Sequence, residues 1–216
     1  GDDPTPLIES PLLDAEDLRY IYPSSPDPRP ALDGVSLRVA AGERIALVGS
    51  NGSGKSTLLG ALSGRLDAGT TRGSPRVIDV PQDPDLALFC STVQKELAYG
   101  PADHRMSPDA VSSRVRDAAE ALSIDDLLDR PPQALSRGQR LRVAVAACLA
   151  CTPDVLILDE PTAGQDREQV ERMMDGLRES MSSGALIFAT HDLELARRHS
   201  TRILVMEDGK FRKRTT

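Results

Sequence analysis

A nine-residue segment, Gly49 to Thr57, constrains the fold of this chain more than any other feature. It reads Gly-Ser-Asn-Gly-Ser-Gly-Lys-Ser-Thr and fits the pattern G-x-x-x-x-G-K-[ST]. An apolar run, residues 45–48, precedes it, and a helix-like stretch, residues 58–62, follows it. Backbone N–H groups can surround a phosphate only where no Cβ intrudes, and the N-terminus of a helix favours an anion. The sequence therefore predicts a strand, a phosphate-binding loop and a helix in that order.

The residues of this loop have predicted roles. Lys55 is expected to reach the β- and γ-phosphates of a nucleotide, and Ser56 to bind Mg²⁺. The other predicted nucleotide-binding positions in the loop are Gly49, Ser50, Asn51, Gly52, Ser53, Gly54 and Thr57. A Gly/Ser-rich surface turn is the plainer interpretation. It does not explain why the loop ends in Lys-Ser and lies between strand and helix signals.

Length and composition exclude several classes of protein. A chain of 216 residues fits one large domain that buries a parallel sheet between helices. No apolar run approaches the roughly 18 residues of a membrane span. A net charge of −7 makes duplex nucleic acid an unfavourable main partner. Cys148 and Cys151 have C-x-x-C spacing but lie in a buried-helix pattern, so we expect core packing instead of a redox or metal site.

Short apolar segments separated by helical patterns predict a mainly parallel, doubly wound α/β sheet. The predicted strands are residues 35–39, 44–48, 77–80, 155–158, 185–189 and 203–206. Residues 109–129 are predicted to be helical, with Ser107 and Pro108 at the N-terminus, and to be inserted between two halves of the sheet. The Pro-rich residues 1–15 are predicted to be a flexible arm or linker, and the domain to span residues 16–216.

A later apolar segment, residues 155–158, ends in two carboxylates, Asp159 and Glu160. Ligands of open α/β folds bind at the carboxyl ends of the strands, which predicts that Asp159 lies beside the phosphate loop and holds Mg²⁺. Glu160 is then free to polarise a water for in-line attack on the γ-phosphorus. The alternative is that both carboxylates simply begin a helix.

A second glycine-containing helix start lies at residues 135–139, Leu-Ser-Arg-Gly-Gln. Ser136 and Gln139 are by themselves a capping box, which is the structural alternative. A capped helix start that contains Gly138 is also an anion site. Because a phosphate loop is already indicated, we interpret this segment as a second site directed at a γ-phosphate.

These motifs, in this order, resemble those of the ATP-binding-cassette family over residues 16–210. Residues 49–57 are similar to its Walker A motif, residues 135–139 to its LSGGQ signature and residues 155–160 to its Walker B motif. The resemblance implies the ABC-ATPase fold of the P-loop NTPases, with a mainly parallel sheet, an antiparallel β-subdomain and an inserted α-helical subdomain at about residues 83–135.

The resemblance also assigns roles to four isolated residues. Gln82 looks like the glutamine that meets Mg²⁺ and the attacking water, and few positions separate it from the Walker A motif, so the β-subdomain is expected to be trimmed. Asp166, in the segment that starts at Ala163, matches the D-loop. His191 matches the switch histidine, and Tyr22 the aromatic residue that stacks on adenine. The plainer alternatives are Gln82 as a loop residue, Asp166 and Asp192 as helix caps, and Tyr20 in place of Tyr22.

The segments 82–100 and 159–166 are similar to the ATPases of energy-coupling-factor importers. This implies that ATP and Mg²⁺ bind, with the metal held by Ser56, Gln82 and Asp159. It implies hydrolysis by Glu160, His191 and Gln82, coupled to import of a vitamin or metal ion.

The resemblance implies partners as well. In a second cassette, whether identical, paralogous or fused, Leu135, Ser136, Gly138 and Gln139 would contact the ATP of the first. A membrane transporter subunit would hold the chain at the cytoplasmic face of the membrane, and no nucleic acid is expected. Arg137 replaces the first glycine of the signature, so we expect binding with slow turnover. The alternatives are a non-transport ABC ATPase of DNA repair or translation and a degenerate regulatory half-site.

Overall fold

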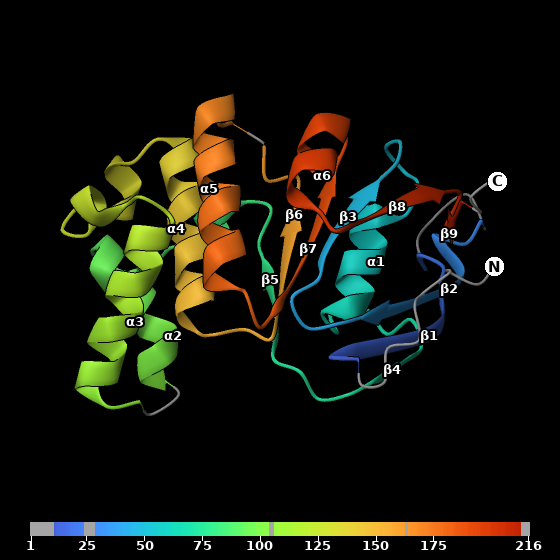
Figure 1. Ribbon diagram of the computed structural model, residues 1–216, viewed down its shortest axis with the longest axis horizontal. Helices are drawn as coiled ribbons and strands as arrows, with labels where there is room; N and C mark the ends of the chain where they lie inside the picture. The colour runs from blue at the N-terminus through green and yellow to red at the C-terminus, as the bar shows by residue number, and fades with distance from the viewer. Residues whose placement is uncertain (1–10, 24–28, 104–105, 163, 213–216) are drawn as a thin grey trace.

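A six-stranded sheet forms the centre of the molecule (Figure 1). The computed structural model describes residues 11–23, 29–103, 106–162 and 164–212. The strand order is β5-β6-β7-β3-β8-β9. The bounds are β3 (Arg44–Val48), β5 (Val77–Val80), β6 (Val155–Asp159), β7 (Ala185–Thr190), β8 (Arg202–Glu207) and β9 (Lys210–Phe211). Every pairing in this sheet is parallel except that of β8 with β9, which confirms the predicted architecture.

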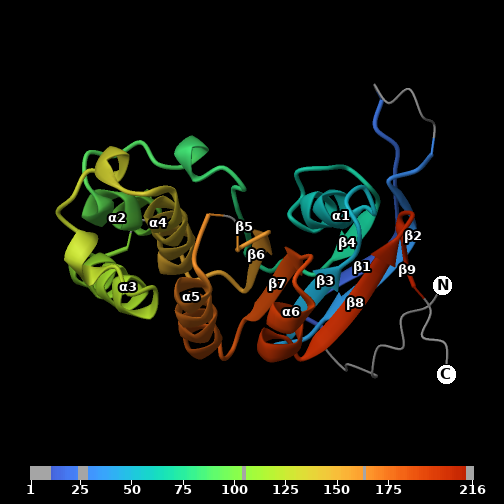
Figure 2. The same cartoon turned by 90° about the horizontal axis from the view of Figure 1, so that it is seen from above.

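The central sheet is buried on both faces and separates two hydrophobic cores. In β3, Ile45 and Leu47 pack into one core while Ala46 and Val48 pack into the other. Helix α1 (Lys55–Leu62) contributes to the first core, and α6 (Leu193–His199) to the second. Figure 2 shows these two helices on opposite sides of the sheet. Burial on both faces explains why these strands read as nearly continuous apolar runs.

A small antiparallel sheet packs with α1 in the core that contains Ile45 and Leu47. Its strand order is β2-β1-β4, with β1 (Leu13–Tyr20), β2 (Leu32–Val39) and β4 (Thr70–Arg72). With only three residues in β4, this sheet is as small as expected. The predicted start of the domain at residue 16 is wrong, because Leu13 and Ala15 are already buried in β1. Residues 1–10 of the predicted arm lie outside the described part of the chain.

Helices connect β5 to β6 and form a lobe at one side of the central sheet (Figure 1). They are η1 (Pro84–Leu86), α2 (Val93–Asp103), α3 (Pro108–Ala121), η2 (Asp125–Leu127), η3 (Pro132–Ala134) and α4 (Arg137–Ala150). Ser107 caps α3 as predicted, since its hydroxyl accepts a hydrogen bond from the N–H of Ala110 at 3.3 Å.

The single helix predicted at residues 109–129 is wrong at its C-terminal end. Helix α3 stops at Ala121, and Ser123 takes a left-handed conformation with φ of 51°. Arg142 of α4 donates to the carbonyl oxygens of Leu122 and Ser123 at 3.4 and 3.1 Å. An arginine from another helix therefore satisfies the carbonyl groups of the two residues at which the chain leaves the helix.

The two cysteines at the end of α4 behave as packing residues, as expected. Cys148 packs against the core of the helical side, and burial raises the pKa of its thiol to about 12. Cys151 is half-buried, and burial raises its pKa also. A thiol kept protonated at neutral pH is a poor nucleophile and metal ligand.

Within the described ranges, no helix is long and apolar enough to cross a membrane.

Helix α5 (Arg167–Ser180) approaches α3 closely at Gly176. A Cβ at this position would overlap the backbone carbonyl of Ala121, which cannot rotate away. We predict that Gly176→Ala lowers the free energy of unfolding by about 2 kcal/mol, the size of a typical overpacking penalty. Urea unfolding followed by circular dichroism measures it.

Gly60→Ala is the matched control for this prediction, because its nearest neighbour is the end of the flexible Leu66 side chain at 3.0 Å. That side chain can move, and alanine favours a helix over glycine by up to about 1 kcal/mol. Equal urea midpoints for the two variants would contradict the close α3–α5 contact.

Candidate nucleotide site

A cavity of about 980 Å³ opens at the carboxyl edge of the central sheet. The predicted site residues that line it are Tyr22, Asn51, Gly52, Gly54, Lys55, Ser56, Thr57, Gln82, Asp159 and Glu160. They come from segments far apart in the sequence, and the parallel register explains why they meet. Val48 pairs with Thr190, and Asp159 pairs with Ala189, so the strands that carry these residues end at the same edge.

The glycine-rich loop joins β3 to α1, as predicted. A Cβ on Gly49 would overlap the carbonyl oxygen of Met206, and one on Gly54 would lie 2.5 Å from the carbonyl oxygen of Ala31. Gly54 is the N-cap of α1, with φ of 106° and no side chain to cap the first N–H groups. Gly52 also has a positive φ, 79°, but a Cβ there would meet nothing within 4 Å. The loop is thus closely packed on one side and open on the other, as a phosphate cradle requires.

Lys55 lies across this loop. Its ammonium group donates to the carbonyl oxygens of Gly49 and Ser50 at 2.8 and 3.1 Å. The third N–H of the ammonium has no partner among the described residues. The buried hydroxyl of Ser53 also lacks a hydrogen-bond partner within the described chain, but it lies on the closed side of the loop, next to Gly49, and does not line the cavity. The unpaired N–H of Lys55 beside an open glycine cradle suits the oxygens of a phosphate chain.

Glu160 and His191 contact one another. Glu160 follows the last residue of β6 with φ of 51°, and its N–H donates to the carbonyl of Ala189 at 3.0 Å. This left-handed conformation is costly for a residue with a side chain, and it ends the alternation of the strand. Nδ1 of His191 lies 2.9 Å from Oε2 of Glu160. When Glu160 is ionised it only accepts hydrogen bonds, so the proton of this contact is on Nδ1.

The structure distinguishes the two tyrosines considered for adenine. The Tyr22 hydroxyl lies 3.2 Å from that of Thr57, and the Tyr22 ring lines the cavity. Tyr20 packs against the core around α1 and meets the Tyr22 ring edge-on, with centroids 5.0 Å apart. Tyr20 therefore supports the Tyr22 ring from the side, and Tyr22 is the one exposed to a ligand.

The predicted signature segment forms the start of α4 and is a complete capping box. The N–H of Ser136 donates to Oε1 of Gln139 at 2.9 Å, and the N–H of Gln139 donates to the hydroxyl of Ser136 at 3.3 Å. Residues 135–139, all of them described, do not line the cavity. Figure 2 shows the α4 side of the molecule and α1 well separated. The signature and the phosphate loop therefore do not meet within one chain.

The predicted D-loop segment packs against the predicted signature segment of the same chain. A Cβ on Gly138 would lie 3.0 Å from the carbonyl oxygen of Gly164, and the Arg137 side chain borders Gly164 on its other side. Asp166 caps α5 by accepting a hydrogen bond from the N–H of Gln169 at 2.9 Å, so its capping role is confirmed. Ala163, the first residue of the predicted D-loop, lies outside the described residues.

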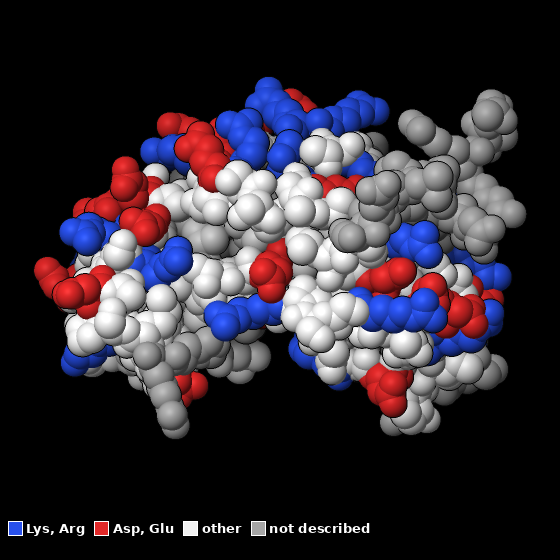
Figure 3. Space-filling view, turned by 60° about the horizontal axis from the view of Figure 1, so that its bottom comes forward, with Lys and Arg blue, Asp and Glu red and all other residues white. Residues whose placement is uncertain are grey.

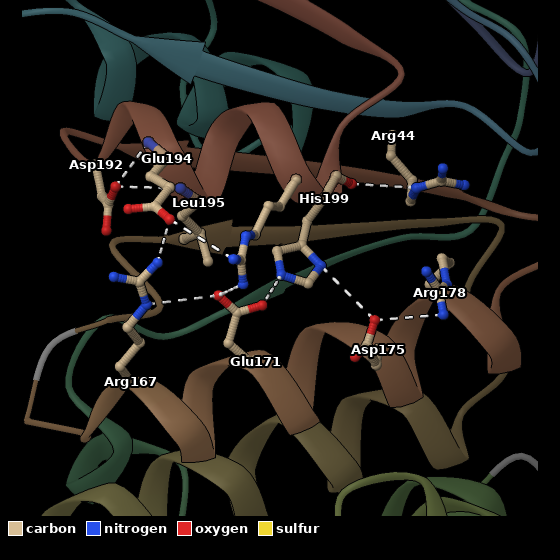
Figure 4. A network of polar contacts seen from close by, with 10 residues as sticks. Arg44, Arg167, Glu171, Asp175, Arg178, Asp192, Glu194, Leu195 and His199 are labelled. Atoms are coloured by element: carbon tan, nitrogen blue, oxygen red, sulfur yellow. Dashed lines mark hydrogen bonds and ion pairs between the residues drawn. The ribbon is translucent and has the colours of Figure 1, made fainter.

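A network of charged side chains joins α5 to α6 (Figure 4). Arg167 pairs with Glu194, while Glu171 binds Arg198 at 2.9 Å and the buried His199 at 2.8 Å. Partial burial opposes ionisation of Glu171, but His199 and Arg198 outweigh it and lower the pKa of this carboxyl. Because α5 follows the D-loop and α6 follows His191, the network links the two loops. The sequence did not reveal it, since such charges are also typical of a solvated helix face.

Sequence reasoning also missed one wall of the cavity. Asp208 and Gly209 form a tight turn between β8 and β9, with φ of 47° and 74°. The N–H of Gly209 donates to the Ser53 carbonyl at 3.0 Å, so the turn supports the phosphate loop. Lys210 binds Asp33 at 2.8 Å on the same wall. The Asp-Gly dipeptide between two strand patterns is a hairpin signal that could have indicated this turn.

Comparisons with known proteins agree with this geometry. The sequence profile of the ABC transporter family matches residues 32–163. The energy-coupling factor transporter ATP-binding protein EcfA2 of Methanospirillum hungatei is 42% identical over 93% of this chain and 54% of its own length. The cobalt import ATP-binding protein CbiO of Rhodobacter capsulatus is 41% identical over 93% of this chain and 77% of its own length. The chain spans only 30% and 36% of two similar Methanosarcina proteins, both putative ABC transporter ATP-binding proteins.

A solved structure gives the same result. CbiO1 from Clostridium perfringens, described as part of the ABC transporter complex cbiONQ, superposes with a TM-score of 0.83 at 32% identity. The match covers 94% of this chain and 87% of that one. The resemblance to the ATPases of energy-coupling-factor transporters and the P-loop fold predicted from the motifs are both confirmed. The chain thus belongs to the ATP-binding-cassette transporter family and has the fold of its ATP-binding domain.

Proposed function

We propose that this chain binds and hydrolyses ATP to power an energy-coupling-factor importer of a vitamin or metal ion. One observation carries the proposal: Lys55 and Ser56 of the phosphate loop line the same cavity as Gln82, Asp159 and Glu160. These side chains supply the groups that phosphoryl transfer to water requires, which are a phosphate cradle, oxygen ligands for a metal and a carboxylate base.

The cavity is half of a site. Ser136 and Gly138 lie outside it, although their hydroxyl and N–H groups suit a phosphate. A second cassette arranged head to tail would place its signature over the open side of the cradle at Gly52. ATP would then lie between the two domains and hold them together until hydrolysis removes the γ-phosphate. Arg137 replaces the first glycine of the signature, and its side chain lies against Gly164. The motif still contains the two groups that suit a phosphate, the N–H of Gly138 and the hydroxyl of Ser136.

The donors at the base of the cavity fit Mg²⁺. Ser56, Gln82 and Asp159 offer a hydroxyl, an amide oxygen and a single carboxylate. Mg²⁺ binds through few protein oxygens and completes its shell with water and phosphate oxygens. When bound there, the ion neutralises charge on the phosphate oxygens.

Glu160 and His191 are the side chains that act in the hydrolysis step. The carboxylate of Glu160 accepts a proton from a water whose oxygen attacks the γ-phosphorus. The bond from that phosphorus to the β–γ bridging oxygen breaks, and ADP and phosphate leave. His191 donates from Nδ1 to Glu160, which orients the carboxylate. With a second proton on Nε2, the same ring would also donate to an oxygen of the transferring phosphoryl group.

An exposed apolar surface next to the cavity fits the membrane subunit. Leu86 and Phe89 are 81% and 64% exposed, and the Phe89 ring packs edge-on against the exposed Tyr99 with centroids 4.9 Å apart. These residues follow Gln82 closely in the chain, so a helix docked here would contact the segment that carries Gln82. A chain docked in this way would lie peripherally on the cytoplasmic face of the membrane.

The visible charges do not favour the nucleic-acid alternative. Among the described residues on the face shown in Figure 3, basic and acidic side chains are interspersed. A phosphate backbone is bound by a continuous basic surface, and the chain as a whole carries a charge of −7.

We predict that Glu160→Gln keeps the affinity for Mg·ATP but lowers turnover at least 100-fold, because an amide cannot accept the proton of the attacking water. Calorimetry measures the affinity, and phosphate release measures the turnover. With ATP, the variant should accumulate as a dimer in size-exclusion chromatography. Glu168→Gln is the control, since Glu168 is an exposed acid on α5. Wild-type turnover in Glu160→Gln would contradict the role given to Glu160.

We predict that Tyr22→Ala raises the Kd for ATP about tenfold, because stacking of a base on an aromatic ring contributes roughly 1–3 kcal/mol. Tyr22→Phe removes only the contact between hydroxyls and should stay near the wild-type Kd. Tyr99→Ala is the control for loss of an exposed tyrosine outside the cavity. If Tyr22→Ala binds ATP as tightly as the wild type, the adenine ring does not lie on Tyr22.

We predict that Phe89→Ser weakens attachment to the membrane subunit, because it removes apolar area from the centre of the docking surface. The chain would be co-expressed with the membrane subunits of its own transporter and purified in detergent. Less Phe89→Ser than wild type should remain with the complex. Ile203→Ser, at an exposed residue on β8, should remain as the wild type does. Equal retention of Phe89→Ser would remove this surface from the interface.

A further inference from the structure

Arg140 connects two segments that the proposed mechanism treats separately. It lies in the first turn and a half of α4, directly after the signature. Its Nε lies 2.6 Å from Oδ1 of Asp85, and its Nη1 donates to the carbonyl oxygen of Leu135 at 2.6 Å. The Arg140 side chain is only 23% exposed. One guanidinium therefore bridges the segment after Gln82 and the residue that precedes Ser136.

The contact with Leu135 fixes the peptide at the start of the signature. The carbonyl of the Leu135–Ser136 peptide accepts from Arg140, and the N–H of the same peptide donates to Gln139 at 2.9 Å. The Leu135 side chain is buried, which restrains the peptide from the other direction. With both polar atoms of the peptide bonded, its plane is set. The Ser136 hydroxyl at the end of this peptide is held by accepting a hydrogen bond from the N–H of Gln139 at 3.3 Å.

The contact with Asp85 reaches the Gln82 segment. Asp83 accepts a hydrogen bond from the N–H of Asp85 at 3.2 Å, and the N–H of Leu86 donates to the Asp83 carbonyl at 3.2 Å. These bonds close a tight turn, η1, between Gln82 in the cavity and the exposed Leu86. A displacement of this turn therefore acts on Arg140 through Asp85.

We propose that Arg140 is a positioning residue that orients the signature for the partner's ATP and couples this orientation to the docking surface at Leu86. The coupling to a partner's ATP rests on the proposed function, whereas the orientation of the Ser136 peptide does not. The alternative is an ordinary surface ion pair, which contributes little. The low exposure of Arg140 and its charged hydrogen bond to a backbone carbonyl distinguish it from such a pair.

The test compares Arg140→Met with Asp85→Asn and with a control, Arg178→Met, which removes an exposed pair with Asp175 on α5. Arg140→Met loses both contacts, while Asp85→Asn is at an exposed position and loses only the ion pair. Three quantities are measured. The first is amide hydrogen exchange at Ser136 in the nucleotide-free chain. The second and third, both in the Glu160→Gln background, are the dimer dissociation constant with Mg·ATP and the Kd for ATP of the single chain.

Arg140→Met should speed exchange at Ser136 and weaken the ATP-bound dimer about tenfold each, the size expected for one lost charge-assisted hydrogen bond. The single-chain Kd for ATP should not change, because the cavity lies in the other half of the site. Asp85→Asn should weaken the dimer less, and Arg178→Met should change none of the three quantities. This split between pairing and nucleotide binding is not expected from general loss of stability.

The outcomes separate the two proposals. If Glu160→Gln alone does not dimerise with ATP, the proposed pairing fails, and exchange at Ser136 still tests the orienting role of Arg140. If Glu160→Gln dimerises and Arg140→Met leaves both the dimer constant and the exchange rate at wild-type values, the inference about Arg140 is overturned.

Discussion

The close packing of the glycine-rich loop against two backbone carbonyls is the constraint on which the rest of the structure depends. Gly49 lies against the carbonyl of Met206 in β8, and Gly54 against that of Ala31 just before β2. No other residue fits at either position without moving one of these strands. The hairpin turn at Gly209 supports the loop by donating to Ser53. Packing closes this side of the loop, and Gly52 and Lys55 line the cavity on the other side.

The parallel register of the central sheet supplies the rest of the site. It pairs Asp159 with Ala189. Glu160 comes one residue after Asp159 and His191 two residues after Ala189, so both follow neighbouring strands at the same edge of the sheet. The left-handed conformation of Glu160 directs its carboxylate to His191, at the expense of backbone strain. Such strain is retained where the surrounding strands impose it. It fits a carboxylate that must hold one orientation toward a water.

Much of this arrangement could be predicted from the sequence, because the motifs combine fixed chemistry with local backbone requirements. The glycine loop, the strand ending in Asp159 and the capping box at Ser136 all depend on residues a few positions apart. The start of β1 at Leu13 and the end of α3 at Ala121 could not be predicted, since both are set by distant segments. Directly after α3, for example, Arg142 of helix α4 binds the carbonyl groups of Leu122 and Ser123.

The contacts that sequence reasoning missed around the site are also made between residues far apart in the sequence. Arg140 and Asp85 each look like solvated charges in the sequence, and only the fold brings them to 2.6 Å. The wall formed by Asp33 and Lys210 likewise joins strands from the two ends of the domain. Sequence patterns therefore indicated the residues to which the proposed mechanism assigns nucleotide contacts, and the structure brings most of them to one cavity. They did not identify the groups that hold those residues in position.

In the proposed mechanism one chain supplies only half of a nucleotide site. A crystal structure of Glu160→Gln with Mg·ATP would show whether this is so. We expect two chains related head to tail, with each triphosphate between Lys55 of one chain and Ser136 of the other. A triphosphate enclosed by a single chain, or bound at a distance from Lys55, would contradict it.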